Sequence, residues 1–293
     1  MTSTNDTLQN ARHLRSAEML RRLSRISVSA KFGAFVLVVA IVLALFGGWI
    51  APHPQGAIPG NTFEGPSGSF WFGTDNVGKD VLSELIHGTR VTLQIGVVAA
   101  GASLIAGIIV GAVSGYFGGK TDIVLMRIAE FFQILPGLLL ALVMAALLGR
   151  RLSLLILAIA ITTWPQSARL VRAQFLSLRH REFVEAARGI GYPSRYIVSR
   201  EILPNALPPA IVQSTLDVGT AILIAAALSF LGLGDPSVPS WGEMLNRAQG
   251  YLSIAWWMAL FPGAAIFLVV LATNLVGDGV TDALDPQERR DGS

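Results

Sequence analysis

Two long stretches of this chain, residues 32–51 and 91–117, contain no charged side chain. An α-helix needs about 20 apolar residues to cross a hydrocarbon layer about 30 Å thick, and each stretch reaches that length. The chain is 52% hydrophobic and 14% charged, whereas soluble domains carry roughly 25% charged residues. The sequence therefore predicts a protein whose solvent is the lipid bilayer. The predicted spans are residues 32–51, 91–117, 123–149, 152–171, 209–232 and 255–277.

The predicted fold class is all-α, a polytopic membrane protein with six transmembrane helices. A transmembrane barrel would need alternating segments of about 10 residues, and the sequence does not contain them. We expect a leader at 1–31, an external loop at 52–90, a transmembrane core at 91–277 and a tail at 278–293. The loop is rich in Gly, Pro, Ser and Asn, which favours irregular structure.

The distribution of Lys and Arg predicts the orientation in the membrane. Cytoplasmic segments of membrane proteins carry an excess of these residues. Most of them lie in the leader, between residues 169 and 200, and in the tail. We therefore expect both termini in the cytoplasm. The net charge of +3 then follows from topology and calls for no nucleic-acid partner. The leader does not have the form of a secretory signal, and is either an interfacial helix or a basic cytoplasmic tail.

Small residues recur every four positions in the second predicted span, at Ala99, Ser103, Gly107, Gly111 and Gly115. Within lipid, small residues let helix backbones approach closely. This face should therefore pack tightly against another helix.

Prolines and tryptophans mark other features of the spans. Pro136, Pro165 and Pro262 each remove a backbone donor and can bend a helix. Trp241 and the pair at 256–257 are expected at the boundary between membrane and water.

The polar segment between the fourth and fifth predicted spans, residues 172–205, has an ordered pattern. Phe183, Ala187 and Ile190 fall at i, i+4 and i+7, which predicts an apolar stripe on a short surface helix from residue 181 to 190. Ala186 and Ala187 have little bulk, so another protein surface can approach this helix closely.

The same segment contains signals for a sharp turn. Gly191 is suited to a left-handed helix cap, and Pro193 with Ser194 can start a second helix. We expect Pro204 to interrupt that second helix before the fifth span. The spacing thus predicts two short helices against the inner membrane face, although an ordinary interfacial hairpin would have the same pattern.

The sequence Glu185-Ala186-Ala187, followed by Gly191 and then Leu203-Pro204, resembles the signature of permease subunits of ATP-binding cassette (ABC) importers. In that family this loop forms the coupling helix, which sits in a cleft of the ATPase. Glu201 departs from the family pattern, which often has an aliphatic residue there. The resemblance implies that the residues coupled to the ATPase are Glu182, Phe183, Glu185, Ala186, Ala187, Gly191, Leu203 and Pro204.

Further stretches are similar to the permeases of dipeptide, oligopeptide and nickel importers, and best match their second, C-type permease. These stretches are residues 72–83, 115–119, 227–234, 241–245, 277–279 and 282–286. The resemblance implies a heterodimer with a homologous permease, two ATPase subunits that bind ATP and Mg, and an external substrate-binding protein. It implies no cofactor in this chain, a transport subunit rather than an enzyme, and a location in a bacterial inner membrane.

Other apparent signals are discounted. Residues 114–121 nearly match the sequence pattern of a phosphate-binding loop. Such a loop must follow a buried strand, whereas residues 114–121 join two predicted spans. The histidines lack metal-ligand spacing, and no grouping suggests hydrolysis.

Ionisable groups within the spans are the remaining candidates. Asp217 interrupts the fifth span, and such groups usually face the protein interior or an aqueous path. It could contact the amine of a peptide, pair with a partner permease, or lie close enough to the inner boundary to be solvated. Glu130 is one turn from Arg127, which predicts a local ion pair. An alternative function stays open, a secondary transporter driven by an ion gradient, with Asp217 and Glu130 as its coupling carboxylates.

Overall fold

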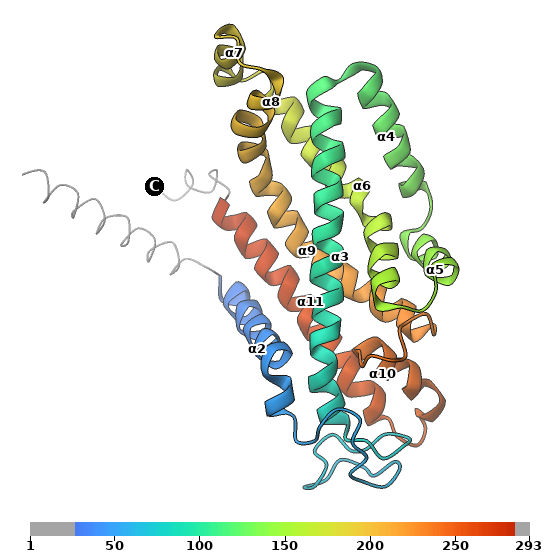
Figure 1. Ribbon diagram of the computed structural model, residues 1–293. Helices are drawn as coiled ribbons and strands as arrows, with labels where there is room; N and C mark the ends of the chain where they lie inside the picture. The colour runs from blue at the N-terminus through green and yellow to red at the C-terminus, as the bar shows by residue number, and fades with distance from the viewer. Residues whose placement is uncertain (1–26, 285–293) are drawn as a thin grey trace, which may run out of the picture.

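The computed structural model describes residues 27–284 as a bundle of long helices (Figure 1). The predicted leader up to residue 26 and the end of the tail from residue 285 lie outside the described residues. Five of the described helices are long and apolar enough to cross a membrane, and the number rises to six when one bent pair of helices is counted as a single span. The all-α prediction is confirmed for the described part of the chain. The helices are α2 (Val28–Ile50), α3 (Val81–Phe117), α4 (Gly119–Ile134), α5 (Gly137–Leu148), α6 (Leu152–Leu178), α7 (Glu182–Gly189), α8 (Ser194–Tyr196), the π-helical η1 (Ile197–Ile202), α9 (Leu203–Phe230), α10 (Trp241–Ala248), the 3₁₀ turn η2 (Gln249–Tyr251) and α11 (Trp257–Leu284).

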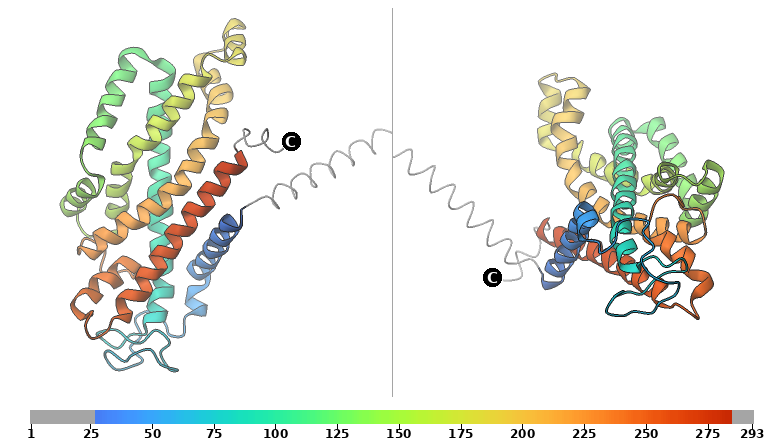
Figure 2. Two further views of the ribbon diagram at one scale, coloured as in Figure 1. Left: turned by 180° about the vertical axis from the view of Figure 1, so that it is seen from behind. Right: turned by 60° about the horizontal axis from the view of Figure 1, so that its bottom comes forward.

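The long helices run between two distinct ends of the molecule. At one end lies α7, and at the other lie α10 and the loop at residues 51–80 (Figure 1). Helix α2 packs beside α11, whereas α4 and α5 lie on the opposite side of the bundle (Figure 2). We call the two ends the α7 end and the α10 end.

The second span begins at Val81 rather than at residue 91 as predicted. The Asp80 side chain caps α3 by accepting from the Ser83 amide at 3.1 Å. Glu84 and Arg90 interrupt the apolar run, so hydrophobicity alone misses this part of the helix. Glu84 is satisfied because Arg247 donates to it at 2.7 Å. The predicted external loop, 52–90, is therefore irregular only as far as residue 80.

The third predicted span is broken. Helices α4 and α5 meet at an angle of 90°, with Pro136 as the residue that precedes α5. A proline has no amide hydrogen to continue the α4 ladder, so the predicted bend is confirmed here. Pro165 and Pro262, in contrast, lie inside helices α6 and α11 that continue past them.

The predicted small-residue face of α3 packs against α6, as expected. A Cβ atom added to Gly107 would lie 2.5 Å from the Ser167 Cβ, and one added to Gly111 would lie 2.5 Å from the Ala168 carbonyl oxygen. Contacts this short show that the two backbones approach as closely as glycine permits. The pair α3–α6 is therefore the rigid centre of the bundle.

The fifth span contradicts one prediction, because Pro204 does not interrupt it. The helical path runs from Ser194 through η1 into α9, and ends at Phe230. The change from π to α hydrogen bonding falls at the start of α9, where Pro204, which lacks an amide hydrogen, is tolerated. The Asn205 side chain donates to the Glu201 carbonyl at 2.7 Å and satisfies one acceptor near this change.

Two tryptophans hold the α10 end together. The Trp241 indole donates to the Leu85 carbonyl at 2.9 Å, and the Trp257 indole donates to the Thr74 carbonyl at 3.0 Å. Both rings are buried in protein, whereas their place at the membrane boundary stays a prediction. Their indole N–H groups explain the burial, since each finds a backbone acceptor inside the fold.

Asp235 joins two loops at the same end. Its carboxylate accepts from the Leu152 amide at 3.0 Å, and so caps α6, whose own N-cap residue supplies no side-chain bond. The Ser237 hydroxyl, at 2.5 Å, together with the backbone amides, lowers the pKa of Asp235 below its ordinary value.

Candidate functional site

The segment between α6 and α9, residues 179–202, folds into a compact elbow at the α7 end. Helix α7 spans Glu182–Gly189, with Glu182 and Glu185 in its first turn and Arg188 in its last. Negative charges near a helix N-terminus and positive charges near its C-terminus complement the helix dipole. The sequence therefore favours a short helix here, as predicted.

Gly191 ends this helix as predicted. Its φ angle is +89°, in the left-handed region. Its amide donates to the Arg188 carbonyl at 2.9 Å, and the Tyr192 amide donates to the Ala187 carbonyl at 3.1 Å. These bonds satisfy carbonyls at the end of α7 and reverse the chain. Pro193 then precedes α8, so the predicted second helix is confirmed.

The face of α7 that packs on the bundle differs from the predicted stripe. Val184 and Ala187 are 0% and 7% exposed, and they belong to one apolar cluster with Phe175 of α6 and Ile197 of η1. Phe183 and Ile190 are 40% and 77% exposed. The predicted stripe did not specify which side of the helix would face the bundle, and in the structure Ala187 is buried whereas Phe183 and Ile190 are exposed. An apolar residue on a short helix can face either the bundle or an outside surface, and periodicity does not distinguish the two.

The outward side of the elbow is an apolar patch with charged neighbours. Its apolar members are Phe183, Ile190, Tyr192 and Tyr196, all exposed. The two tyrosine rings stack with centroids 4.3 Å apart. Glu185 and Ala186 are also exposed on α7. A protein surface in contact with water rarely exposes a contiguous apolar patch unless the patch binds another molecule.

The residues of the Leu203-Pro204 pair lie at the base of the elbow rather than in the patch. They are the first two residues of α9. Leu203 packs against the cluster that contains Val184, and Pro204 is exposed. The structure thus gathers Glu182, Phe183, Glu185, Ala186, Ala187 and Gly191 in the elbow and gives Leu203 and Pro204 a supporting position.

The elbow is also tied to the turn between α3 and α4, which sequence reasoning missed. The Arg188 guanidinium lies over the Tyr116 ring, 5.9 Å from its centroid. The Arg179 side chain donates to the Gly115 carbonyl at 3.2 Å. Asp122 pairs with Arg172 close by, at 2.5 Å. A signal for this pair was present, because both residues lie where a predicted span reaches the inner boundary.

The structure keeps Asp217 and Glu130 apart. Asp217 is 8% exposed, accepts from Gln213 at 3.1 Å and from Ser167 at 3.4 Å, and forms no ion pair within the described chain. The Asp217 carboxylate is therefore shielded from solvent, which excludes the alternative that water solvates it at the inner boundary. Glu130 accepts from Arg127 at 3.0 Å on an exposed face of α4, so the predicted local ion pair is confirmed.

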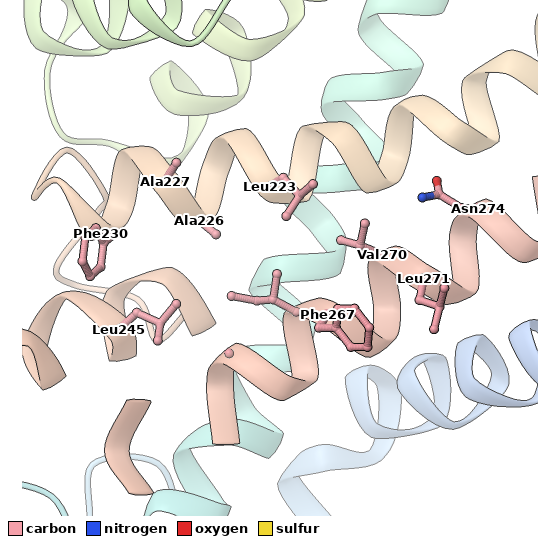
Figure 3. Close-up of a pocket in the computed structure, with 11 residues that line it drawn as sticks. Leu223, Ala226, Ala227, Phe230, Leu245, Phe267, Val270, Leu271 and Asn274 are labelled. Carbon is pink, nitrogen blue, oxygen red and sulfur yellow. The ribbon is translucent and has the colours of Figure 1, made fainter. Parts of the chain in front are cut away.

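An apolar groove of about 540 Å³ lies between α9, α10 and α11 (Figure 3). Leu223 of α9 lies opposite Val270 of α11, and Phe230 of α9 lies opposite Leu245 of α10 (Figure 3). Asn274 supplies the one polar side chain among the residues that line this groove. An exposed amide on a membrane-spanning helix is better satisfied by protein than by lipid tails.

Comparison with known proteins places the chain in a family. Residues 104–290 match the model of "binding-protein-dependent transport system inner membrane component". The dipeptide transport system permease protein DppC of Alkalihalophilus pseudofirmus is 42% identical, over 87% of this chain and 84% of that protein. The di/tripeptide transport system permease protein DppC of Pseudomonas aeruginosa is 41% identical, over 87% of each. The glutathione transport system permease protein GsiD of Escherichia coli is 42% identical, over 92% of this chain and 90% of that protein.

A solved structure has a similar fold. It is a chain of the MetNI methionine ABC transporter in an inward-facing conformation, with a TM-score of 0.51 and 20% identity. The match covers 67% of this chain and 96% of that chain. At this identity the likeness concerns the fold alone.

Proposed function

The chain belongs to the family of binding-protein-dependent transport system inner membrane components, and is a permease subunit of an ABC importer; we propose that its cargo is short peptides and that its elbow receives the force of the ATPase. The relatives at about 40% identity are named for dipeptide, di/tripeptide and glutathione transport, which supports the cargo class. Selectivity among peptides would rest largely in the separate external binding protein.

The single observation that carries the coupling proposal is the two-sided packing of α7. Its Val184–Ala187 side is fixed to the bundle, while Phe183 and Ile190 are left exposed. A helix that is anchored on one side and apolar on the other can pass a displacement from an outside partner to the spans. The partner proposed here is one of two ATPase subunits, which bind ATP and Mg. In this arrangement the exposed Glu185 lies in the surface that contacts the ATPase. ATP shifts the bundle from one conformation to the other because the complex binds ATP more tightly in one of them.

We propose that the α7 end is cytoplasmic and that the α10 end faces outside. The basic residues of the elbow, Arg179, Arg181, Arg188, Arg195 and Arg200, support this orientation. It places both termini in the cytoplasm and leaves the ordered loop at 51–80 available to the binding protein.

A homologous second permease would complete the translocation path. The groove at α9–α11, with its exposed Asn274, suits a protein neighbour better than lipid. Asp217 is our candidate contact for the path, since a buried carboxylate within a span is costly without a function. Glu130 is paired with Arg127 on an exposed face of α4, so we do not propose it as a residue of the path. The ion-gradient alternative has no support in the family matches, and it would require these two separate carboxylates to act together.

The test is purification of the complete importer with tagged permease. Glu185→Lys reverses a charge in the proposed contact and should lower co-purification of the ATPase about tenfold, the effect of losing roughly 1.4 kcal/mol. Gln55→Lys adds a positive charge at the α10 end and serves as the control, with no loss expected. Uptake of a dipeptide by the wild-type complex should require ATP and survive an uncoupler. Unchanged co-purification of the Glu185→Lys variant would contradict the docking assignment.

A further inference from the structure

The first turn of α4 is bound to two other helices through a single carboxylate. Asp122 accepts two hydrogen bonds from Arg172 of α6, from Nε at 2.5 Å and from Nη2 at 2.6 Å. It also accepts from the Ser114 hydroxyl of α3. A bidentate pair between an arginine and a carboxylate fixes both distance and orientation. We call Ser114, Asp122 and Arg172 the corner brace.

The corner brace lies directly beside the support of the elbow. Phe175 of α6 is fully buried in the same apolar cluster as Val184 and Ala187 of α7 and Ile197 and Ile202 of η1. A Cβ atom added to Gly115 of α3 would lie 2.6 Å from the Phe175 Cβ. The cluster that holds α7 therefore includes a residue of α6 that packs directly on α3. Since Ser114 and Arg172 belong to α3 and α6, the brace extends these contacts to α4.

Helix α4 is lightly packed: apart from Asp122, the Phe132 ring near its far end meets the Trp164 ring of α6, with centroids 5.7 Å apart. Ala129 is its one buried residue among those described, and the residue that precedes the helix, Gly118, offers no side-chain cap. Its far end is the break at Pro136, where the chain turns by 90° into α5. At the α7 end, then, the position of α4 depends on Asp122.

On the basis of the proposed function, we propose that the Asp122–Arg172 pair positions α4 for coupling. The pair makes the α7-end termini of α3, α4 and α6 one rigid body beneath the elbow. Displacement of the elbow by the ATPase is thereby delivered to the broken span α4–α5 as well as to α9. Without the pair, α7 and α9 still move, but α4 lags behind them, and ATP hydrolysis proceeds without the full change in the transport path.

The experiment replaces the ion pair by a removable covalent tether. The chain has no cysteine, so Asp122→Cys with Arg172→Cys introduces a unique pair of thiols into this subunit, to be assembled with cysteine-free partner subunits. In the reduced complex we expect the ATPase to co-purify and hydrolyse ATP, while dipeptide uptake per ATP falls about tenfold, the order expected when a charge-assisted pair is lost. A bifunctional methanethiosulfonate should restore the uptake per ATP, and a reductant should abolish it again. A monofunctional reagent of the same class should restore nothing.

The matched control is Arg127→Gln, which breaks an exposed ion pair on the same helix and should leave uptake per ATP unchanged. Normal uptake per ATP in the reduced cysteine pair, or no recovery after cross-linking, would overturn the proposal. Asp122→Asn, which keeps the side-chain shape, is the second variant: it too should insert and hydrolyse ATP with reduced uptake. If neither variant inserts, the pair serves folding alone and the proposal fails. A wild-type complex that neither binds the ATPase nor uses ATP would instead refute the proposed function.

Discussion

The two faces of α7 should respond differently to the same kind of truncation. Val184 is 0% exposed and lies within the cluster that includes Phe175 and Ile197. Val184→Ala removes two buried methyl groups, which costs about 1.6 kcal/mol by transfer, and a cavity adds to this, for a total of about 2 kcal/mol. An eight-residue helix is too short to persist alone, so this loss should raise local opening of α7. A change of about 2 kcal/mol corresponds to an increase in the opening equilibrium of roughly 30-fold.

Hydrogen–deuterium exchange of the purified permease measures this opening directly. Amides of α7 should exchange roughly 30-fold faster in Val184→Ala than in the wild type, while those of α3 keep their rates. Ile190→Ala is the matched truncation on the exposed side. It should leave the exchange of α7 unchanged but weaken co-purification of the ATPase. If Val184→Ala did not change exchange in α7, or if Ile190→Ala loosened the helix, the assignment of the two faces would be wrong.

Three further substitutions test other parts of the account. Gly191→Val forces a β-branched residue into a left-handed conformation. The variant should still be recovered from the membrane fraction, but its uptake per ATP should fall. Gly111→Val places a side chain against the Ala168 carbonyl of α6 and should destabilise the bundle by about 1–3 kcal/mol in thermal unfolding in detergent. Asp235→Asn weakens the cap on α6 and should cost about 1 kcal/mol at pH 7. Because the folded pKa of Asp235 is lowered, the contribution of its charge is complete above the unfolded pKa of about 3.9 and is lost as the pH falls through the folded value. The two proteins should therefore melt alike in strong acid, and a constant difference would refute the role of that charge.

Much of the fold could be predicted from the sequence because lipid imposes a simple length rule. The uncharged run at 91–117 lies within α3, and the run at 32–51 lies within α2 except for its last residue. The same rule fails at Glu84 and Arg90, since it treats charge as the end of a span. Arg247, far away in the sequence, pairs with Glu84, and such long-range compensation is invisible to a local pattern.

Local signals predicted the turns better than they predicted the helices beside them. Gly191 and Pro136 act as their backbone chemistry requires, because a left-handed residue and a missing amide are local properties. Pro204 has the same chemistry as Pro136 but breaks nothing, because the π-helical segment before it accommodates the missing donor. Whether a proline breaks a helix therefore depends on the register of the turns around it.

The sequence indicated where the short helix of the candidate site lies, but it did not indicate which side of that helix packs on the bundle. The Gly191 cap marked the end of α7 correctly. Ala187, expected on the side open to another protein, is buried instead, and the buried Val184 went unnoticed. A periodic pattern identifies apolar residues without saying which neighbour each will meet. The corner brace escaped notice for a related reason, since Asp122 and Arg172 lie in different spans and only the packing of α3 against α6 brings them together.

The most direct test of the central claim is a cross-link from α7 to the ATPase. Ala186 is exposed on this helix and the chain is free of cysteine, so Ala186→Cys places a unique thiol of this subunit in the proposed contact. In the assembled importer we predict a cross-link from this thiol to the ATPase subunit, whose yield changes when ATP is bound. A soluble thiol reagent should reach the same position only from the cytoplasmic side, and only when the ATPase is absent. Free labelling of Cys at position 186 in the complete complex, or labelling from the outer side of sealed cells, would contradict the account.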